Sequence, residues 1–311
     1  MSRAFSLPTT TNAAFDAARA GGVVDTAVGL PKSREDMYEF YEFIRRQTRD
    51  TESKDGLEFP AGYMFKDVPQ WESEEMGDPV ELLLGEMDRH GLSHCIIGPA
   101  DDHGERALRE HPDRFSAGVG VDPNDGMEAV RTIERACERF DVKVVGCFPA
   151  GLIPQVPLND KKFFPIYAKC VELDLTFAAT VGVPGPRIPY APQATELLDE
   201  VCWFFPELRF VTRHGSEPWT ALMVKLLLKW PNLYYSTTAF APKYYPADIV
   251  EFANTRGADK IIFSGYFPAG LTYDRIFAEL PDVPFRDHVW PKFLRENAAR
   301  VFKLDVPEWS A

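Results

Sequence analysis

The sequence has no excess of basic charge that would suit a polyanionic partner. It carries 34 lysine and arginine residues against 47 aspartate and glutamate residues, which gives a formal net charge of −13. A surface of this sign repels the phosphates of nucleic acids and the anionic head groups of lipids. We therefore expect neither nucleic acid nor a membrane as a partner.

Paired cysteines and long hydrophobic runs are also missing. The five cysteines are widely spaced and form no CxxC pair, so neither a disulfide framework nor a cysteine-based zinc site is expected. No segment reaches the roughly 18 apolar residues that a membrane span needs, and residues 1–11 lack the apolar core of a signal peptide. These features predict reduced thiols and a cytoplasmic location.

Glycine-rich nucleotide loops are absent as well. The first predicted strand runs into Asp25-Thr26-Ala27-Val28-Gly29, with no GxGxxG, and the chain has no GxxxxGK segment. A dinucleotide-binding or nucleotide-binding sheet would need such a loop to hold phosphates. The sequence therefore does not favour those two classes.

The chain does contain a regular alternation of short apolar runs and amphipathic stretches, which is typical of repeated βα units. The predicted strands are Val23–Val28, His94–Gly98, Phe115–Val121, Val142–Cys147, Leu175–Val181, Leu208–Thr212, Leu233–Ser236 and Lys260–Ser264. Helices are expected between them and after the last one. Eight such units predict a (β/α)8 TIM barrel forming one domain over residues 1–311, with an open doubly wound sheet as the alternative.

A long connection, residues 30–78, follows the first predicted strand, where barrel enzymes build their active sites. It is rich in aromatic residues, among them Tyr38, Tyr41, Phe43 and Trp71. So many exposed rings would be unusual on a surface with no partner. We expect this insertion to act as a lid over a pocket or as the contact of a homodimer.

Two candidate catalytic residues end predicted strands. His214 follows the apolar run of residues 208–213 and would stand at the mouth of the barrel as a general acid or base; the alternative is a buried histidine in a capping turn. Asp25 ends Val23-Val24, and a carboxylate is costly to bury there unless it is paired or acts as a base. Both interpretations of Asp25 stay open.

Four further residues are candidates for binding a substrate. Arg213 and Glu217 flank His214, and Arg187 lies on a proline-stiffened loop that could present a guanidinium to a carboxylate. A surface ion pair is the alternative for Arg187. His103 follows two aspartates after the second predicted strand, where it is either an acid or base or part of a helix start.

Several segments resemble the amidohydrolase superfamily, in particular the branch of aminocarboxymuconate semialdehyde decarboxylase and related aromatic-acid decarboxylases. The resemblance runs from about Val23 to Leu304. Its motifs are Pro206-Glu207-Leu208-Arg209-Phe210-Val211 leading to His214-Gly215 and Pro218-Trp219, then Trp230-Pro231-Asn232-Leu233, then Asp259-Lys260-Ile261-Ile262, and a last helix over residues 293–302. The resemblance implies the barrel fold.

The resemblance also implies a divalent metal, held by an HxH on the first strand, a histidine on the fifth and an aspartate on the eighth. Here the HxH positions are Ala27 and Gly29, the fifth-strand position is Thr180, and the eighth strand runs into Ser264-Gly265-Tyr266. The family also has a histidine on the sixth strand that commonly assists catalysis. His214 matches that position, and it is the only one of these functional positions that keeps its residue type. Because alanine, glycine and threonine are not firm ligands, we expect no metal cofactor.

A rebuilt metal site is the alternative for the cofactor. It would hold one zinc or manganese ion, using substitute ligands drawn from Asp25, His103, His214 and Glu217.

The leading functional hypothesis is an enzyme of amidohydrolase descent that acts on a small organic acid or cyclic carbonyl compound without a metal, as a hydratase, decarboxylase or other lyase. His214 would be the acid or base, Arg213 or Arg187 would hold the substrate anion, and Tyr266 would donate a hydrogen bond to developing negative charge. Thr180 belongs to the expected binding set. The alternatives are a metal-dependent hydrolase and a ligand-binding protein without catalysis.

Overall fold

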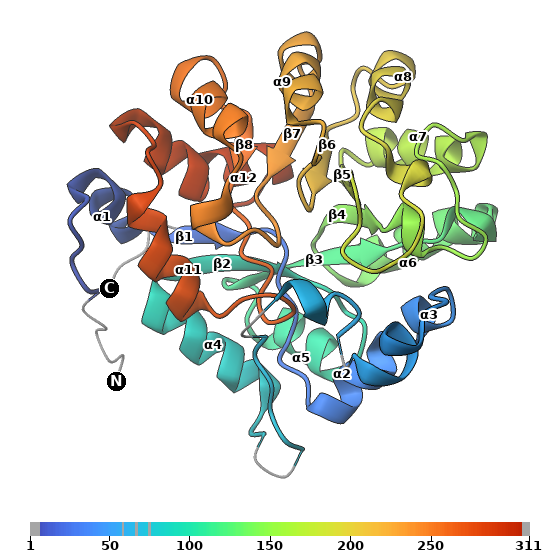
Figure 1. Ribbon diagram of the computed structural model, residues 1–311, viewed down its shortest axis with the longest axis horizontal. Helices are drawn as coiled ribbons and strands as arrows, with labels where there is room; N and C mark the ends of the chain where they lie inside the picture. Colours follow the sequence, from blue (N-terminus) through green and yellow to red (C-terminus); the bar gives the residue numbers. More distant parts are fainter. Residues whose placement is uncertain (1–6, 58, 66–67, 74–75, 307–311) are drawn as a thin grey trace.

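Eight parallel strands form one sheet that curls into a barrel in the order β1 to β8 (Figure 1). The computed structural model describes residues 7–57, 59–65, 68–73 and 76–306. The strands are β1 (Val23–Asp25), β2 (Leu92–Ile97), β3 (Phe115–Gly120), β4 (Val142–Cys147), β5 (Thr176–Thr180), β6 (Phe210–Arg213), β7 (Leu233–Ser236) and β8 (Ile261–Ile262). The predicted TIM barrel is confirmed.

Helices surround the strands, most of them on the outside, as expected for βα units. They are α1 (Ala13–Ala20), α4 (Pro79–His90), α5 (Asp102–Glu110), α6 (Met127–Arg139), α7 (Phe164–Glu172), α8 (Leu197–Phe204), α9 (Thr220–Lys229), α10 (Ala247–Thr255), α11 (Tyr273–Glu279) and α12 (Asn297–Phe302). In α4 the Asp78 side chain caps the first turn, and Gly91 ends the helix in the left-handed conformation. The described part of the chain contains no helix long and apolar enough to span a membrane.

The interior of the barrel is filled by one inward-facing residue from nearly every strand. These residues pack together with α12, which closes the bottom of the barrel: Val24, Ile96, Val144, Ala178, Val211, Tyr234 and Ile262, with Ala298, Val301 and Phe302. Because side chains alternate along a strand, residues two positions further on also face inward. Those residues lie nearer the C-terminal mouth and set its chemistry.

The gap between β8 and β1 is bridged by loop and side-chain contacts. The Thr26 hydroxyl donates to the Phe263 carbonyl at 3.5 Å, and the Gly29 N–H donates to the Phe267 carbonyl at 2.8 Å. Predicted strands at this seam were too long, since β1 ends at Asp25 and β8 spans only two residues. The chain bends there because it must close a ring.

The insertion after β1 contains α2 (Arg34–Phe40), α3 (Glu42–Arg45) and short helical turns at Glu52–Gly56 and Gly62–Met64. In Figure 1, α2 and α3 lie at the lower right, away from α8, α9 and α10. The insertion touches loops that follow four strands. It does so through Lys32–Asp101 at 3.0 Å, Gln47 Nε2–Gly151 O at 2.6 Å, Tyr63 OH–Gly185 O at 2.6 Å, and the edge-to-face contact of Trp71 with Phe267. These contacts place it over the C-terminal mouth.

Candidate active site

Four neighbouring strands contribute inward-facing residues just below the mouth. Two positions beyond the interior layer, β4 supplies Gly146, β5 supplies Thr180, β6 supplies Arg213 and β7 supplies Ser236. Thr180 and Arg213 are register partners in the sheet. This ring therefore combines a glycine and two hydroxyls with one long cationic side chain.

Arg213 reaches across the barrel from β6 toward β4. Its Nη1 atom lies 3.2 Å from the position that a Cβ on Gly146 would take, so glycine leaves the room that the guanidinium uses. Burial lowers the pKa of Arg213, while Tyr266 and Asp25 oppose that shift. Arg213 is half-buried, and among the described residues no carboxylate forms an ion pair with it, although a cation withdrawn from water normally has such a partner.

His214 directly follows Arg213 and has a positive φ of 60°. Its ring meets the Tyr266 ring edge to face, with 4.5 Å between centroids. Burial lowers the pKa of His214 to about 3, and the neighbouring Arg213 adds to the shift. The imidazole is therefore neutral at physiological pH in the free protein.

Tyr266 lies opposite His214 and also has a positive φ, 61°. Such backbone conformations are uncommon for residues other than glycine and gather at functional sites. Burial raises the pKa of Tyr266, while a side-chain hydrogen bond with Tyr41 and the charge of Arg213 oppose the rise. The phenol is neutral and can donate a hydrogen bond.

Tyr41 brings the insertion into this site. Its pKa is raised by burial and by the neighbouring Tyr266, and its ring packs edge to face on Phe59 at 5.1 Å. In the sequence, Tyr41 is only one of the several aromatic residues of the insertion. Its role could not be read from the sequence, because Tyr266 lies far away along the chain.

Asp25 is 0% exposed and accepts four hydrogen bonds. Oδ1 accepts from the Ala27 N–H and the Ser264 hydroxyl at 3.2 Å each, and Oδ2 accepts from the Gly265 N–H at 2.9 Å and the Tyr273 hydroxyl at 3.0 Å. Burial raises the pKa of Asp25 to about 6 despite these donors. With both oxygens engaged, the carboxylate ties β1 to the segment after β8, and we leave it out of the catalytic group.

Glu217 lies beside the turn that follows His214. Its Oε2 is 3.4 Å from the Ser216 N–H, and a Cβ added to Gly215 would overlap it, so the carboxylate folds back over the turn. Burial raises the pKa of Glu217. The structure thus brings Thr180, Arg213, His214 and Glu217 together around the ends of β5 and β6.

Two predicted binding residues lie outside this group. Arg187 forms ion pairs with Asp50 and Glu52 at 2.7 Å each, and stacks on Tyr63 at 4.6 Å. It fastens the insertion to the loop after β5, which is the surface ion pair considered as its alternative. His103 is exposed in the first turn of α5, away from His214.

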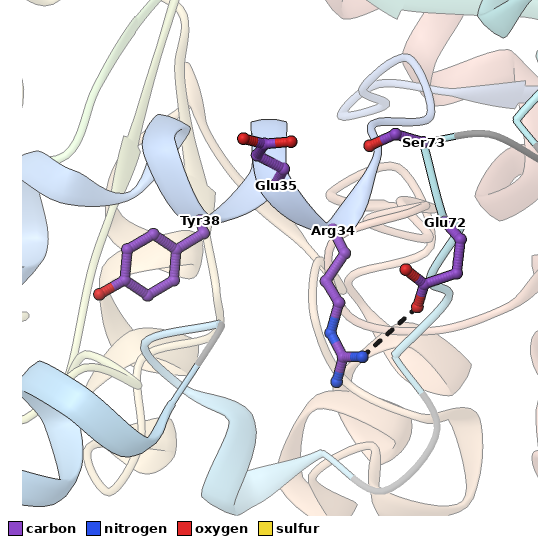
Figure 2. A pocket seen from close by; sticks show the side chains of 5 residues that line it. All are labelled: Arg34, Glu35, Tyr38, Glu72 and Ser73. Carbon is purple, nitrogen blue, oxygen red and sulfur yellow. Dashed lines mark hydrogen bonds and ion pairs between the residues drawn. The ribbon is translucent and has the colours of Figure 1, made fainter.

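A cavity of about 370 Å³ opens beside Gly146 at the ends of β3 and β4. A second one, of about 320 Å³, lies within the insertion, lined by Arg34, Glu35, Tyr38, Glu72 and Ser73 (Figure 2). Arg34 and Glu72 pair across it at 3.4 Å, and its lining residues belong to the insertion alone. Only the first cavity adjoins Arg213.

The residues at the mouth do not fit the divalent metal that the fold family implies. Residues 7–57, 59–65, 68–73 and 76–306 contain no group of three histidine, cysteine, aspartate or glutamate side chains that could hold a metal ion. The donors at the ligand positions are poor, and a guanidinium, which repels cations, stands among them. We therefore derive no catalytic step through a metal.

Comparison with known proteins supports the fold and its ancestry. Residues 30–304 match the family model described as amidohydrolase. No curated protein sequence matches the chain.

Among solved structures, an uncharacterised TIM-barrel protein from Bordetella bronchiseptica has a TM-score of 0.71 at 20% identity, covering 91% of this chain and 98% of that one. The 5-carboxyvanillate decarboxylase of Novosphingobium aromaticivorans, complexed with manganese and 4-hydroxy-3-methoxy-5-nitrobenzoic acid, has 0.62 at 16%, covering 98% and 100%. The 4-oxalomesaconate hydratase of Rhodopseudomonas palustris has 0.56 at 16%, covering 90% and 95%.

At these identities the solved structures show the fold alone. The family model spans most of the chain, and it confirms the resemblance that the motifs predicted. At the level of the family, the prediction of an amidohydrolase-like enzyme is also confirmed, with the reaction left unspecified. The chain belongs to the amidohydrolase family.

Proposed function

We propose that this protein is an enzyme that acts on a small organic acid by metal-independent acid and base chemistry at His214. One observation carries the proposal: the guanidinium of Arg213 lies in the mouth of the barrel beside a neutral imidazole, with no ion-pair partner among the described residues. A desolvated cation of this kind has a strong preference for an anionic ligand. A substrate carboxylate would meet that preference.

Substrate binding also changes the pKa of His214, the proposed base. Arg213 is one of the two causes that hold the pKa of His214 down. Burial is the larger cause and remains, but a carboxylate paired with Arg213 compensates the charge of Arg213, so the pKa of His214 rises and its imidazole becomes a stronger base once substrate is bound. His214 then accepts a proton from the substrate, and the imidazolium returns it to the leaving group or product carbon.

Tyr266 has the geometry of a stabilising donor. Its neutral phenol lies against the His214 ring and can donate a hydrogen bond to an oxyanion that forms as the proton leaves. The insertion, with Tyr41, excludes water from the mouth. This chemistry suits a hydratase, a decarboxylase or another lyase.

The test is a screen of small hydroxy and keto acids, followed by proton NMR for water addition or loss of carbon dioxide. We expect His214→Ala to lower turnover of any converted acid by about 10³-fold, within the range of general acid–base catalysis. His103→Ala is the matched control, because that histidine is exposed and should leave turnover unchanged. Equal turnover by wild type and His214→Ala overturns the proposal, and tight binding without turnover favours a ligand-binding protein.

The insertion supports a second, structural part of the proposal, a homodimer. Tyr38, Phe40 and Tyr63 are 41–49% exposed on its surface, although its other face covers the mouth. Aromatic side chains are enriched in interfaces between subunits. Light scattering across a concentration series tests this assembly, and a monomer at every concentration contradicts it.

A further inference from the structure

The cavity beside Gly146 has the shape and chemistry of a ligand site with two different ends. It lies between the insertion and the ends of β3 and β4, with a volume of about 370 Å³, within the range of small-molecule sites. Its walls are glycine and apolar: Gly120, Gly146 and Gly151, with Phe43, Val121, Phe148, Leu152 and Ile153. Asp122 is the one charged residue that lines it.

Arg213 does not line the cavity itself but lies behind Gly146 at its first end. Gly146 lines the cavity, and Nη1 of Arg213 lies 3.2 Å from the Cβ position of that same glycine. Gly120 lines it on the neighbouring strand, and no atom lies within 4 Å of the position of its missing Cβ. The two glycines therefore leave open space that leads to the guanidinium.

The other end is anionic. Asp122 is half-buried at the start of the turn after β3, where its Oδ1 accepts a hydrogen bond from the Asn124 N–H at 2.8 Å. No described residue donates to its Oδ2. A half-buried carboxylate with one open oxygen favours a cationic donor over a neutral one, because charge-assisted hydrogen bonds are stronger.

The net charge of the chain also disfavours a purely anionic ligand. A net charge of −13 repels ligands that carry only negative charge. A zwitterion avoids that repulsion and can still present a carboxylate to Arg213.

We infer that this cavity binds a zwitterionic carboxylate, with its carboxylate on Arg213, its ammonium group on Asp122 and its apolar body between Phe43 and Phe148. The inference deepens the proposed function and rests on it, since both use Arg213 as the anion site. It adds Asp122 as the residue that selects the substrate class.

Calorimetric titration with pairs of carboxylates that differ only in the ammonium group tests the inference without any turnover. The pairs are 4-(aminomethyl)benzoate with 4-methylbenzoate, 6-aminohexanoate with hexanoate, and 4-aminobutanoate with butanoate, which cover three lengths. In at least one pair the ammonium compound should bind the wild type about 10-fold more tightly, as expected for one charge-assisted hydrogen bond. If no pair shows a preference, the inference is overturned.

Asp122→Asn keeps the Oδ1 that caps Asn124 and removes the charge, so it should abolish the preference within the pair without weakening the binding of the carboxylate that lacks the ammonium group. Asp125→Asn, an exposed acid in the same turn, is the control and should change neither. Gly120→Val fills the open space and should weaken both members, which tests the cavity even if Asp122→Asn misfolds.

Arg213→Met separates the two hypotheses. Loss of all carboxylate binding in this variant, with no effect of Asp122→Asn, overturns the zwitterion inference and keeps the anion site of the proposed function. Unchanged binding in Arg213→Met overturns both.

Discussion

Asp25 and Arg213 are both charged side chains inside the barrel, the first fully buried and the second half-buried, and their surroundings are opposite. Asp25 has four donors on its two oxygens and holds β1 against the end of β8. Arg213 has no ion pair with any residue that the structure describes, and it lies over a glycine at the mouth. A buried carboxyl group whose hydrogen bonds are complete ties segments of the fold together, whereas a charge whose partner is missing marks the place where a ligand supplies it.

Arg213→Met should give the largest effect and sharpen this comparison. The variant keeps the length and apolar volume of the side chain but removes the charge that pairs with the substrate. We expect kcat/KM to fall about 10³-fold, the cost of removing one partner of a buried charge pair, while the melting temperature is unchanged or higher. A large drop in the melting temperature would mean that Arg213 stabilises the fold and would break the contrast with Asp25.

Asp25→Asn should lower the stability of the protein and not its turnover, the opposite of Arg213→Met. Each oxygen of Asp25 accepts one backbone N–H, so an asparagine amide must turn its NH2 toward a donor in either orientation. We expect the free energy of unfolding to drop by about 3 kcal/mol, measured by urea denaturation, with normal turnover per folded molecule. Ser264→Ala, which removes one hydroxyl donor, is a milder control at about 1 kcal/mol.

The pH dependence of the stability lost in Asp25→Asn is a finer test. Since burial raises the pKa of Asp25 from 3.8 to about 6, the folded state holds this proton more tightly than the unfolded state. The stability that protonation contributes is complete below about pH 3.8 and is lost as pH rises through about 6. The penalty of Asp25→Asn should therefore shrink between pH 4.5 and pH 7.5, and a constant penalty would contradict the raised pKa.

Chelation should have the smallest effect. If Arg213 is the cation at the mouth, protein purified without chelator should contain less than about 0.1 divalent metal per chain, and its melting temperature should not change with EDTA. Stoichiometric zinc or manganese with a melt that EDTA lowers would show that a ligand set has been rebuilt. Arg213 would then no longer be the one cation that the substrate meets, and the comparison would fail.

The fold could be predicted from the sequence because parallel strands buried on both faces leave apolar runs at regular spacing. The same reasoning placed His214 and Arg213 at the mouth, since both end an apolar run. It could not settle Asp25, because a strand buried on both faces gives no sign of which face a residue takes. The structure decides this: Val24 faces the interior layer, and the next residue bonds to α11 through Tyr273.

The parts of the site that sequence reasoning missed depend on contacts between distant segments. Tyr41 meets Tyr266, and Gly146 makes room for Arg213, although neither pair is close along the chain. Arg187 could have been a substrate anchor from its loop alone, and only the position of Asp50 and Glu52 shows where its charge is used. The pairings of Tyr41 and of Arg187 are set by the path of the insertion, which has no periodic pattern, and that of Gly146 with Arg213 is set by the curvature of the barrel.

The contact between Tyr41 and Tyr266 has a kinetic consequence. One partner belongs to the insertion and the other to the barrel, and the insertion is fastened to loops after β2, β4, β5 and β8. Tyr266 has Tyr41 beside it only while the insertion holds this position, so the insertion and the barrel complete this part of the site together. Any motion of the insertion therefore makes and breaks part of the site, so its rate enters the rate of turnover together with that of the chemical step.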